Sequence, residues 1–171
     1  VDAVGQSGVT NRPVVVVGAG ADAVRTALGE GCDYVTQEQQ LGTGHAVAQC
    51  QALLAGRADA VLVLYGDQPL VKGPTVRTLV NAHERERPTI TMMTIKVPDF
   101  DDWRRPFASF GRIQRGDAGK LQGIVEVKDA NPQDLKITEL NPAYFCFDGA
   151  WLWPRLERLS NRNAQSEYYL T

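Results

Sequence analysis

Gln37-Glu38-Gln39-Gln40-Leu41-Gly42-Thr43-Gly44-His45-Ala46 links a short strand pattern at residues 34–36 to a helix pattern at residues 44–56. Because Gly42 and Gly44 carry no Cβ, a ring or a phosphate can lie on the backbone, and the first N–H groups of the predicted helix point to the same place. The amides of Gln37 and Gln40 can bond both a donor and an acceptor edge, as a pyrimidine presents. We interpret this stretch as a nucleotide-binding turn. The alternative is a glycine-rich strand-to-helix turn with a threonine cap.

Residues 60–70 read AVLVLYGDQPL and predict a strand that ends in a polar turn. The apolar run 60–64 has the length and branching of a strand that is buried on both faces. Asp67 then lies at the carboxyl end of a central strand, where open α/β sheets bind their ligands. A carboxylate there, after a glycine, suits a hard cation such as Mg²⁺ between phosphates. The alternative is that Asp67 caps the loop or helix that follows.

Strand and helix patterns alternate along residues 1–97. This order predicts an α/β fold with a Rossmann-like, mostly parallel sheet and helices on both faces. The expected strands are 13–18, 34–36, 60–65 and 89–97, and the expected helices are the helix tail 1–4, 21–28, 44–56 and 74–86.

The pattern changes after Pro98. We expect an irregular segment at 99–109, a hairpin of strands 111–115 and 120–127 around the turn 116–119, a strand at 143–147 and a helix at 150–159. No linker divides the chain, so residues 1–171 are predicted to form one domain, with a small antiparallel flap grafted on a parallel core.

Composition excludes several classes of function. The 171 residues are 43% hydrophobic and carry a net charge of −2, which gives no electrostatic basis for binding nucleic acid. No apolar run is long enough to span a membrane, and residues 1–5 do not resemble a signal peptide. The three cysteines are odd in number and irregularly spaced, as expected of free thiols in a reducing, cytoplasmic environment.

A second glycine-rich turn offers a rival interpretation. Gly18 and Gly20, followed by Ala23, form a Gly-x-Gly-x-x-Ala turn between a strand and a helix, and Glu38 could accept a ribose hydroxyl, as in dinucleotide-binding enzymes. The signal is weak because short glycine-rich turns are common. Glu38 also lies beyond the strand at 34–36, inside the stretch already interpreted.

Five motifs occur in the order and spacing of a known family. The chain resembles the uridylyltransferase half of the bifunctional bacterial UDP-N-acetylglucosamine pyrophosphorylase / glucosamine-1-phosphate N-acetyltransferase, over nearly its whole length. The motifs are QLGTGHA at 40–46, LYGDQPL at 64–70, GRI at 111–113, GIVEVKDA at 123–130 and NAQSEYYLT at 163–171.

This resemblance implies a fold of the nucleotide-diphospho-sugar transferase type, with the nucleotide on residues 1–97 and the sugar on residues 98–171. It implies an Mg²⁺-dependent transfer from UTP to N-acetylglucosamine-1-phosphate, which yields pyrophosphate and UDP-N-acetylglucosamine, a peptidoglycan precursor. It also implies a homo-oligomer, a trimer in the full-length family. The residues that match the uracil site are Gln37, Gly42 and Thr43, those under the ribose and phosphates are Tyr65, Gly66 and the metal ligand Asp67, and those of the amino sugar are Gly111, Glu126 and Asn141.

The chain also departs from the family pattern. It lacks the Gly-x-Gly-Thr-Arg-Met loop, the Pro-Lys pair and the asparagine that is the second metal ligand, so the predicted domain is incomplete and its own activity is in question. It also has no β-helix for acetyl transfer. The family has Asn-Thr-Gly where this chain has Asn141-Pro142-Ala143. Another nucleotide-sugar pyrophosphorylase, or an inactive truncated or degenerate domain, therefore stays open.

Three further side chains have structural alternatives. Glu126 could pair with Lys128, which lies two residues on and so on the same strand face. His45 is expected to pack or to form hydrogen bonds, because a phosphate nucleophile needs no base and a helix N-terminus disfavours imidazolium. His83 lies on the apolar stripe of a helix and is expected to be structural.

Overall fold

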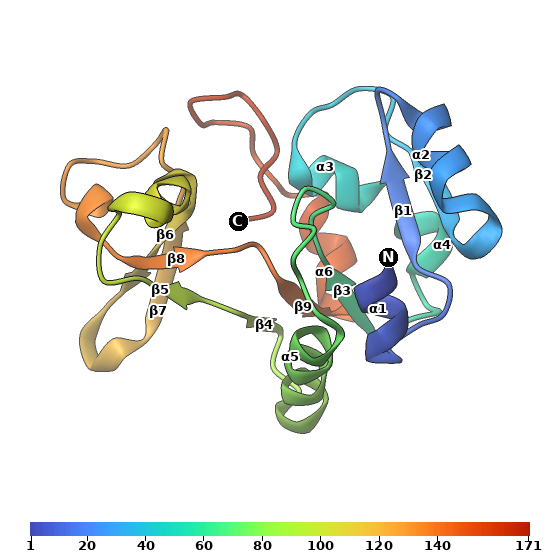
Figure 1. Ribbon diagram of the computed structural model, residues 1–171, viewed down its shortest axis with the longest axis horizontal. Coiled ribbons are helices and arrows are strands. Elements are labelled where there is room, and N and C mark those ends of the chain that lie inside the picture. Colours follow the sequence, from blue (N-terminus) through green and yellow to red (C-terminus); the bar gives the residue numbers. More distant parts are fainter.

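The structure, a computed structural model, describes all 171 residues and has a larger and a smaller part (Figure 1). The larger part contains β1 to β4, β9 and the six α-helices, and the smaller part contains β5 to β8. The strands are β1 (Val14–Val17), β2 (Asp33–Thr36), β3 (Ala60–Val63), β4 (Ile90–Met92), β5 (Ile95–Lys96), β6 (Gly111–Arg115), β7 (Leu121–Val125), β8 (Glu139–Asn141) and β9 (Phe145–Asp148). The α-helices are α1 (Asp2–Ser7), α2 (Ala21–Leu28), α3 (Thr43–Ala48), α4 (Gln51–Leu54), α5 (Gly73–Glu86) and α6 (Gly149–Leu156).

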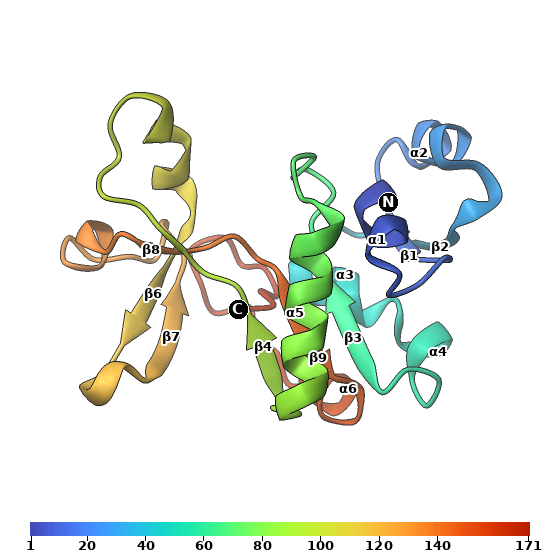
Figure 2. The same ribbon diagram turned by 60° about the horizontal axis from the view of Figure 1, so that its bottom comes forward.

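Helices cover both faces of β3 and β9, as predicted. Successive side chains of a strand point to opposite faces. Phe145 and Phe147 of β9 therefore join a core with α3 and α6, whereas Cys146 between them packs against Leu79 and Val80 of α5. Figure 2 shows α5 in front of β9, between β4 and β3. The central strands are thus buried on both sides, which is why they read as continuous apolar runs.

The pairing of the strands differs from the expected mostly parallel sheet. β1 and β2 pair in parallel, whereas β9 lies between β3 and β4 and is antiparallel to both. β3 and β4 therefore run in the same direction without touching. The alternation of patterns along the chain correctly indicated an α/β fold. It could not indicate that a strand from the C-terminal third enters the centre of the sheet.

The smaller part is an antiparallel sheet of order β5-β8-β6-β7, and its β6–β7 hairpin is the predicted flap. The strand expected at 89–97 is divided into β4 and β5, because β4 pairs with β9 in one sheet and β5 with β8 in the other. The helix expected at 44–56 is likewise divided into α3 and α4. Residues 99–109, expected to be irregular, contain the 3₁₀ helix Asp102–Ser109, and β8 was not predicted.

No helix of the structure combines the length and the apolar character needed to cross a membrane.

Candidate functional site

The predicted nucleotide turn is a compact loop between β2 and α3. Gln37 is buried, and its Nε2 donates to the Gly42 carbonyl at 3.1 Å and lies 2.9 Å from Nδ1 of His45. His45 therefore has the hydrogen-bonding role expected from the sequence. The Oε1 of Gln37 has no partner in the chain, nor do the backbone N–H groups of Gly42 and Thr43. One acceptor and two donors are thus left for a ligand.

The two glycines of this loop face the chain itself, which the sequence did not predict. A Cβ on Gly42 would lie 2.7 Å from the Tyr168 carbonyl oxygen, and one on Gly44 would overlap the Leu159 side chain. The backbone of Tyr168 also exchanges two hydrogen bonds with the loop, from its own N–H to Leu41 O at 2.7 Å and from the Gly44 N–H to its carbonyl at 2.8 Å. The missing Cβ atoms therefore make room for the C-terminal segment.

Asp67 lies in an exposed turn after β3, and its carboxylate forms no salt bridge. The capping alternative does not hold, because α5 begins at Gly73 with Lys72 at its N-cap and no side chain caps it. Beside it, the Nε2 of Gln68 donates to the Pro142 carbonyl at 2.8 Å, which ties the turn to the segment between β8 and β9. A free carboxylate is thus held at the end of a central strand.

Gly111 and Glu126, predicted for the sugar, are in contact. A Cβ on Gly111 would lie 3.0 Å from Oε1 of Glu126. The alternative ion pair with Lys128 is not formed. Instead, Oε1 of Glu126 accepts a hydrogen bond of 3.1 Å from the Thr171 hydroxyl.

Asn141 is buried and partly occupied by its own backbone. Its Oδ1 accepts the Ala143 N–H at 2.9 Å, and Ala143 is in the left-handed region, with φ of 61°. The nitrogen of the Asn141 side-chain amide is left to donate to other partners.

The Tyr65 phenol is influenced by residues from both halves of the predicted site. Burial is the main cause that raises the pKa of this phenol, and the charges of Glu126 and Asp67 raise it further, whereas a hydrogen bond with Thr43 lowers it. Burial, followed by the charge of Asp67, likewise raises the pKa of Tyr144. Residues from the nucleotide loop, the strand end and the flap therefore all affect the ionisation of one tyrosine.

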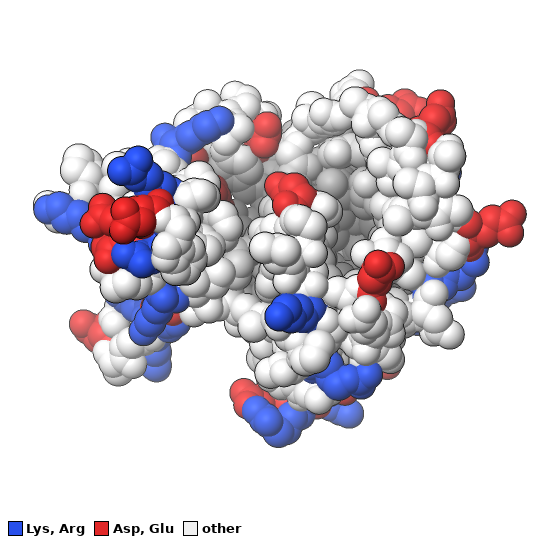
Figure 3. Space-filling model, in the orientation of Figure 1, with Lys and Arg blue, Asp and Glu red and all other residues white.

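The face that carries these elements is hollowed on both sides of the loop that follows β3, and charged side chains lie mainly on its rim (Figure 3). No group of three or more His, Cys, Asp or Glu side chains could by itself hold a metal ion. A single carboxylate such as that of Asp67 can be sufficient for Mg²⁺, because beside phosphates this ion is usually held by one or two carboxylates and takes its remaining ligands from substrate and water. His83 is buried and bonded to the Thr91 hydroxyl at 2.9 Å, as expected of a structural histidine.

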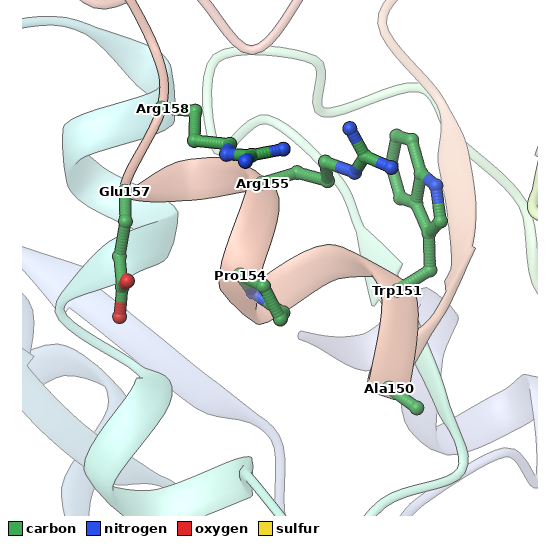
Figure 4. Close-up of a pocket in the computed structure, with 6 residues that line it drawn as sticks. All are labelled: Ala150, Trp151, Pro154, Arg155, Glu157 and Arg158. Carbon is green, nitrogen blue, oxygen red and sulfur yellow. The ribbon is translucent and has the colours of Figure 1, made fainter.

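Sequence reasoning missed an apolar cavity of about 240 Å³ that adjoins the site. Its lining includes Gln68, Phe110 and Pro142, each of which is next in the chain to a residue predicted for the site, and also Tyr144. These side chains come from distant segments, so no local pattern indicated the cavity. An open pocket of about 450 Å³ on the outer side of α6 contains none of the predicted site residues, and in it the Arg155 guanidinium lies over the Trp151 ring (Figure 4).

The rival dinucleotide turn does lie between β1 and α2, and β1 and β2 are parallel. A Cβ on Gly18, the first glycine of the turn, would lie 2.8 Å from Nε2 of Gln40, whereas a Cβ on Gly20, the glycine that a pyrophosphate would approach, would meet nothing within 4 Å.

Comparisons with known proteins identify the family of the chain. A family model described as a MobA-like NTP transferase domain matches residues 1–168. The bifunctional protein GlmU of Limosilactobacillus fermentum is 46% identical over 158 residues, which are 92% of this chain and 33% of the relative. GlmU of an Exiguobacterium species is 41% identical over 170 residues, 99% of this chain and 36% of the relative. The chain thus spans about a third of the length of these relatives.

A solved structure of UDP-glucose pyrophosphorylase complexed with UDP-glucose superposes with a TM-score of 0.69 at 14% identity, and the match covers 99% of this chain and 69% of that one. The apo form of UDP-glucose pyrophosphorylase gives 0.64 at 13% identity. These likenesses confirm the expected α/β fold of the nucleotide-diphospho-sugar transferase type.

Proposed function

Because the chain belongs to the MobA-like NTP transferase family, we propose that it forms the uridylyltransferase part of an enzyme that makes UDP-N-acetylglucosamine and pyrophosphate from UTP and N-acetylglucosamine-1-phosphate. The observation that carries this proposal is that Thr43 and Glu126, from the two halves of the predicted site, accept hydrogen bonds from the adjacent residues Leu170 and Thr171. The similarity to GlmU proteins supports the same reaction class.

The nucleotide loop fits the imide edge of uracil. Oε1 of Gln37 can accept the N3–H group, and the free N–H groups of Gly42 and Thr43 can donate to a ring carbonyl. Tyr65 and Gly66 then lie under the ribose and phosphates. Since recognition needs no charged side chain, the uncharged groups of Gln37, Gly42 and Thr43 suit this base.

The reaction itself needs positioning more than covalent help. An oxygen of the sugar phosphate attacks the α-phosphorus of UTP, the bond from that phosphorus to the bridging oxygen of the β-phosphate breaks, and pyrophosphate leaves. The attacking oxygen is already ionised at neutral pH, so no base is assigned. Asp67 would hold Mg²⁺, which supplies positive charge between the two polyanions.

Gly111, Glu126 and Asn141 would bind the sugar. Glu126 can accept from ring hydroxyls, Gly111 has no side chain that would displace the Glu126 carboxylate, and Asn141 can donate through its amide nitrogen. The product would be a peptidoglycan precursor made in the cytoplasm, by a homo-oligomer when the enzyme is complete.

A second candidate is another nucleotide-sugar pyrophosphorylase, which is favoured by one observation. Pro142 has no N–H, and Ala143 adopts a left-handed backbone although it is not glycine, so this edge of the sugar site departs from the family pattern.

The test is pyrophosphate release by the complete gene product with UTP, Mg²⁺ and a panel of sugar 1-phosphates. We expect the highest kcat/KM with N-acetylglucosamine-1-phosphate. A preference for glucose-1-phosphate would show that the proposed sugar substrate is wrong, whereas the proposed reaction class would stand. No release of pyrophosphate with any sugar 1-phosphate would support the remaining alternative, a domain without catalytic activity.

A further inference from the structure

Residues 163–171, which we call the strap, contact both parts of the chain. Figure 1 shows this C-terminal segment running between α3 and the smaller part. On the flap side, the Ala164 N–H donates to Asp129 Oδ1 at 2.8 Å. On the other side, Tyr168 forms the two backbone hydrogen bonds with Leu41 and Gly44 that hold the nucleotide loop.

The strap has its own internal scaffold. Oδ1 of Asn163 accepts the N–H groups of Gln165 and Glu167, both at 3.2 Å, and Nδ2 of Asn163 donates to the Glu167 carbonyl at 2.6 Å. One side chain thus closes the turn on both its donor and acceptor sides. A segment organised in this way can transmit a displacement from one end to the other.

Two adjacent residues of the strap reach the two halves of the site. The Leu170 N–H donates to Oγ1 of Thr43 at 3.0 Å, and the Thr171 hydroxyl donates to Oε1 of Glu126 at 3.1 Å. A path of two hydrogen bonds, joined by the peptide link between Leu170 and Thr171, therefore runs from Thr43 to Glu126.

We propose that Thr171 is a positioning residue for Glu126 and that the strap couples the sugar side of the site to the nucleotide loop. The assignment of Glu126 to the sugar rests on the proposed function. The Thr171 hydroxyl engages one oxygen of the carboxylate and leaves Oε2 to accept from a sugar hydroxyl. Without it, the carboxylate rotates more freely, and the strap loses an anchor next to Thr43.

The kinetic test uses Thr171→Val in the complete gene product. This change removes the hydroxyl of an exposed residue and keeps its shape. We expect the KM for the sugar phosphate to rise about three- to tenfold, the factor that one ordinary hydrogen bond supplies, with kcat little changed. Thr171→Ser should restore the wild-type KM. Tyr169→Phe is the control, because that hydroxyl bonds only Gln165 within the strap.

The coupling is tested by hydrogen exchange of the Gly44 amide, which donates to Tyr168 and needs no catalysis to be read. In Thr171→Val we expect this amide to exchange about three- to tenfold faster, and in Thr171→Ser and Tyr169→Phe at the wild-type rate. Unchanged exchange in Thr171→Val would overturn the coupling, and an unchanged sugar-phosphate KM would overturn the positioning role. A wild-type protein that transfers to no sugar phosphate would refute the proposed function, while the exchange of Gly44 still decides whether the strap couples.

Discussion

Ala143 donates its N–H to Oδ1 of Asn141 at 2.9 Å while its own backbone is left-handed, with φ of 61°. The asparagine side chain closes a tight turn that brings the chain from β8 into β9. A left-handed backbone costs a residue with a Cβ roughly 1–2 kcal/mol, so the turn that borders the proposed sugar site stores strain.

Replacing Ala143 with glycine should therefore be nearly neutral. Relief of the strain offsets the lost burial of a methyl group, about 0.8 kcal/mol, and the larger entropy of an unfolded glycine, about 0.4–1 kcal/mol. We expect the free energy of unfolding in urea to change by less than about 1 kcal/mol. Ala48→Gly in α3 is the control and should cost about 1 kcal/mol or more. Equal losses in both variants would show that Ala143 is not strained.

Gly42→Ala should destabilise the protein far more than Gly20→Ala. Both glycines have positive φ, 109° and 77°, but a Cβ on Gly42 would lie 2.7 Å from the Tyr168 carbonyl, whereas a Cβ on Gly20 would meet nothing within 4 Å. Gly20→Ala should cost about 1–2 kcal/mol for its backbone. Gly42→Ala should cost about 1–3 kcal/mol more, because its backbone, with φ of 109° and ψ of 177°, lies in a region that is essentially restricted to glycine and because the loop or the strap must move. Thermal unfolding of the two variants measures the difference, and equal costs would mean that the strap does not pack on Gly42.

The contrast between these two glycines illustrates what could be predicted from the sequence. Helix α5 was predictable because its buried residues Val76, Leu79, Val80 and His83 recur with the helical period. The position of Asp67 just after β3 was predictable because a strand end is a local feature. In contrast, the close packing of Tyr168 against Gly42 is a contact between residues that are far apart in the chain. Nothing in the sequence near either residue indicates it.

The same limit applies to the sheet and to the sugar site. Residues 143–147 were recognised as a strand, but their insertion between β3 and β4 pairs them with segments that are far away in the chain. Gly111 and Glu126 were placed together only through the resemblance to a family. Their contact arises from the register of β6 with β7, in which Arg112 pairs with Val125.

Glu139 should make the protein sensitive to acid. Hydrogen bonds from Arg115 are the main cause that lowers the pKa of this buried carboxyl to about 2, and Thr94 and the charge of Lys96 add to it. The folded pKa lies below the usual value of 4.5, so the stabilisation is complete above pH 4.5 and is lost as the pH falls towards 2. It amounts to roughly 1–3 kcal/mol, allowing for solvent screening of the half-exposed Arg115.

Urea unfolding of the wild type and of Glu139→Gln between pH 2 and pH 6 tests this expectation. The difference in the free energy of unfolding should be largest above pH 4.5 and should shrink towards pH 2. A difference that stays constant over this range would show that the ionised carboxylate adds nothing beyond the shape of the side chain.

Asp67→Asn should abolish most of the turnover and leave the fold intact. The carboxylate is exposed and forms no salt bridge, so its replacement by an amide of the same shape removes no contact that stabilises the protein. If Asp67 holds the metal ion between the reacting phosphates, the transition state loses about 3–5 kcal/mol, which corresponds to roughly 10²–10⁴ in rate.

Asp117→Asn, at another exposed carboxylate in the flap turn, is the matched control and should keep wild-type turnover. Both variants should unfold at the wild-type temperature, so that a loss of rate reports on chemistry alone. Near-normal turnover of Asp67→Asn at saturating Mg²⁺ would show that Asp67 is only a turn residue. The ligands of the metal would then have to lie elsewhere than at the end of β3.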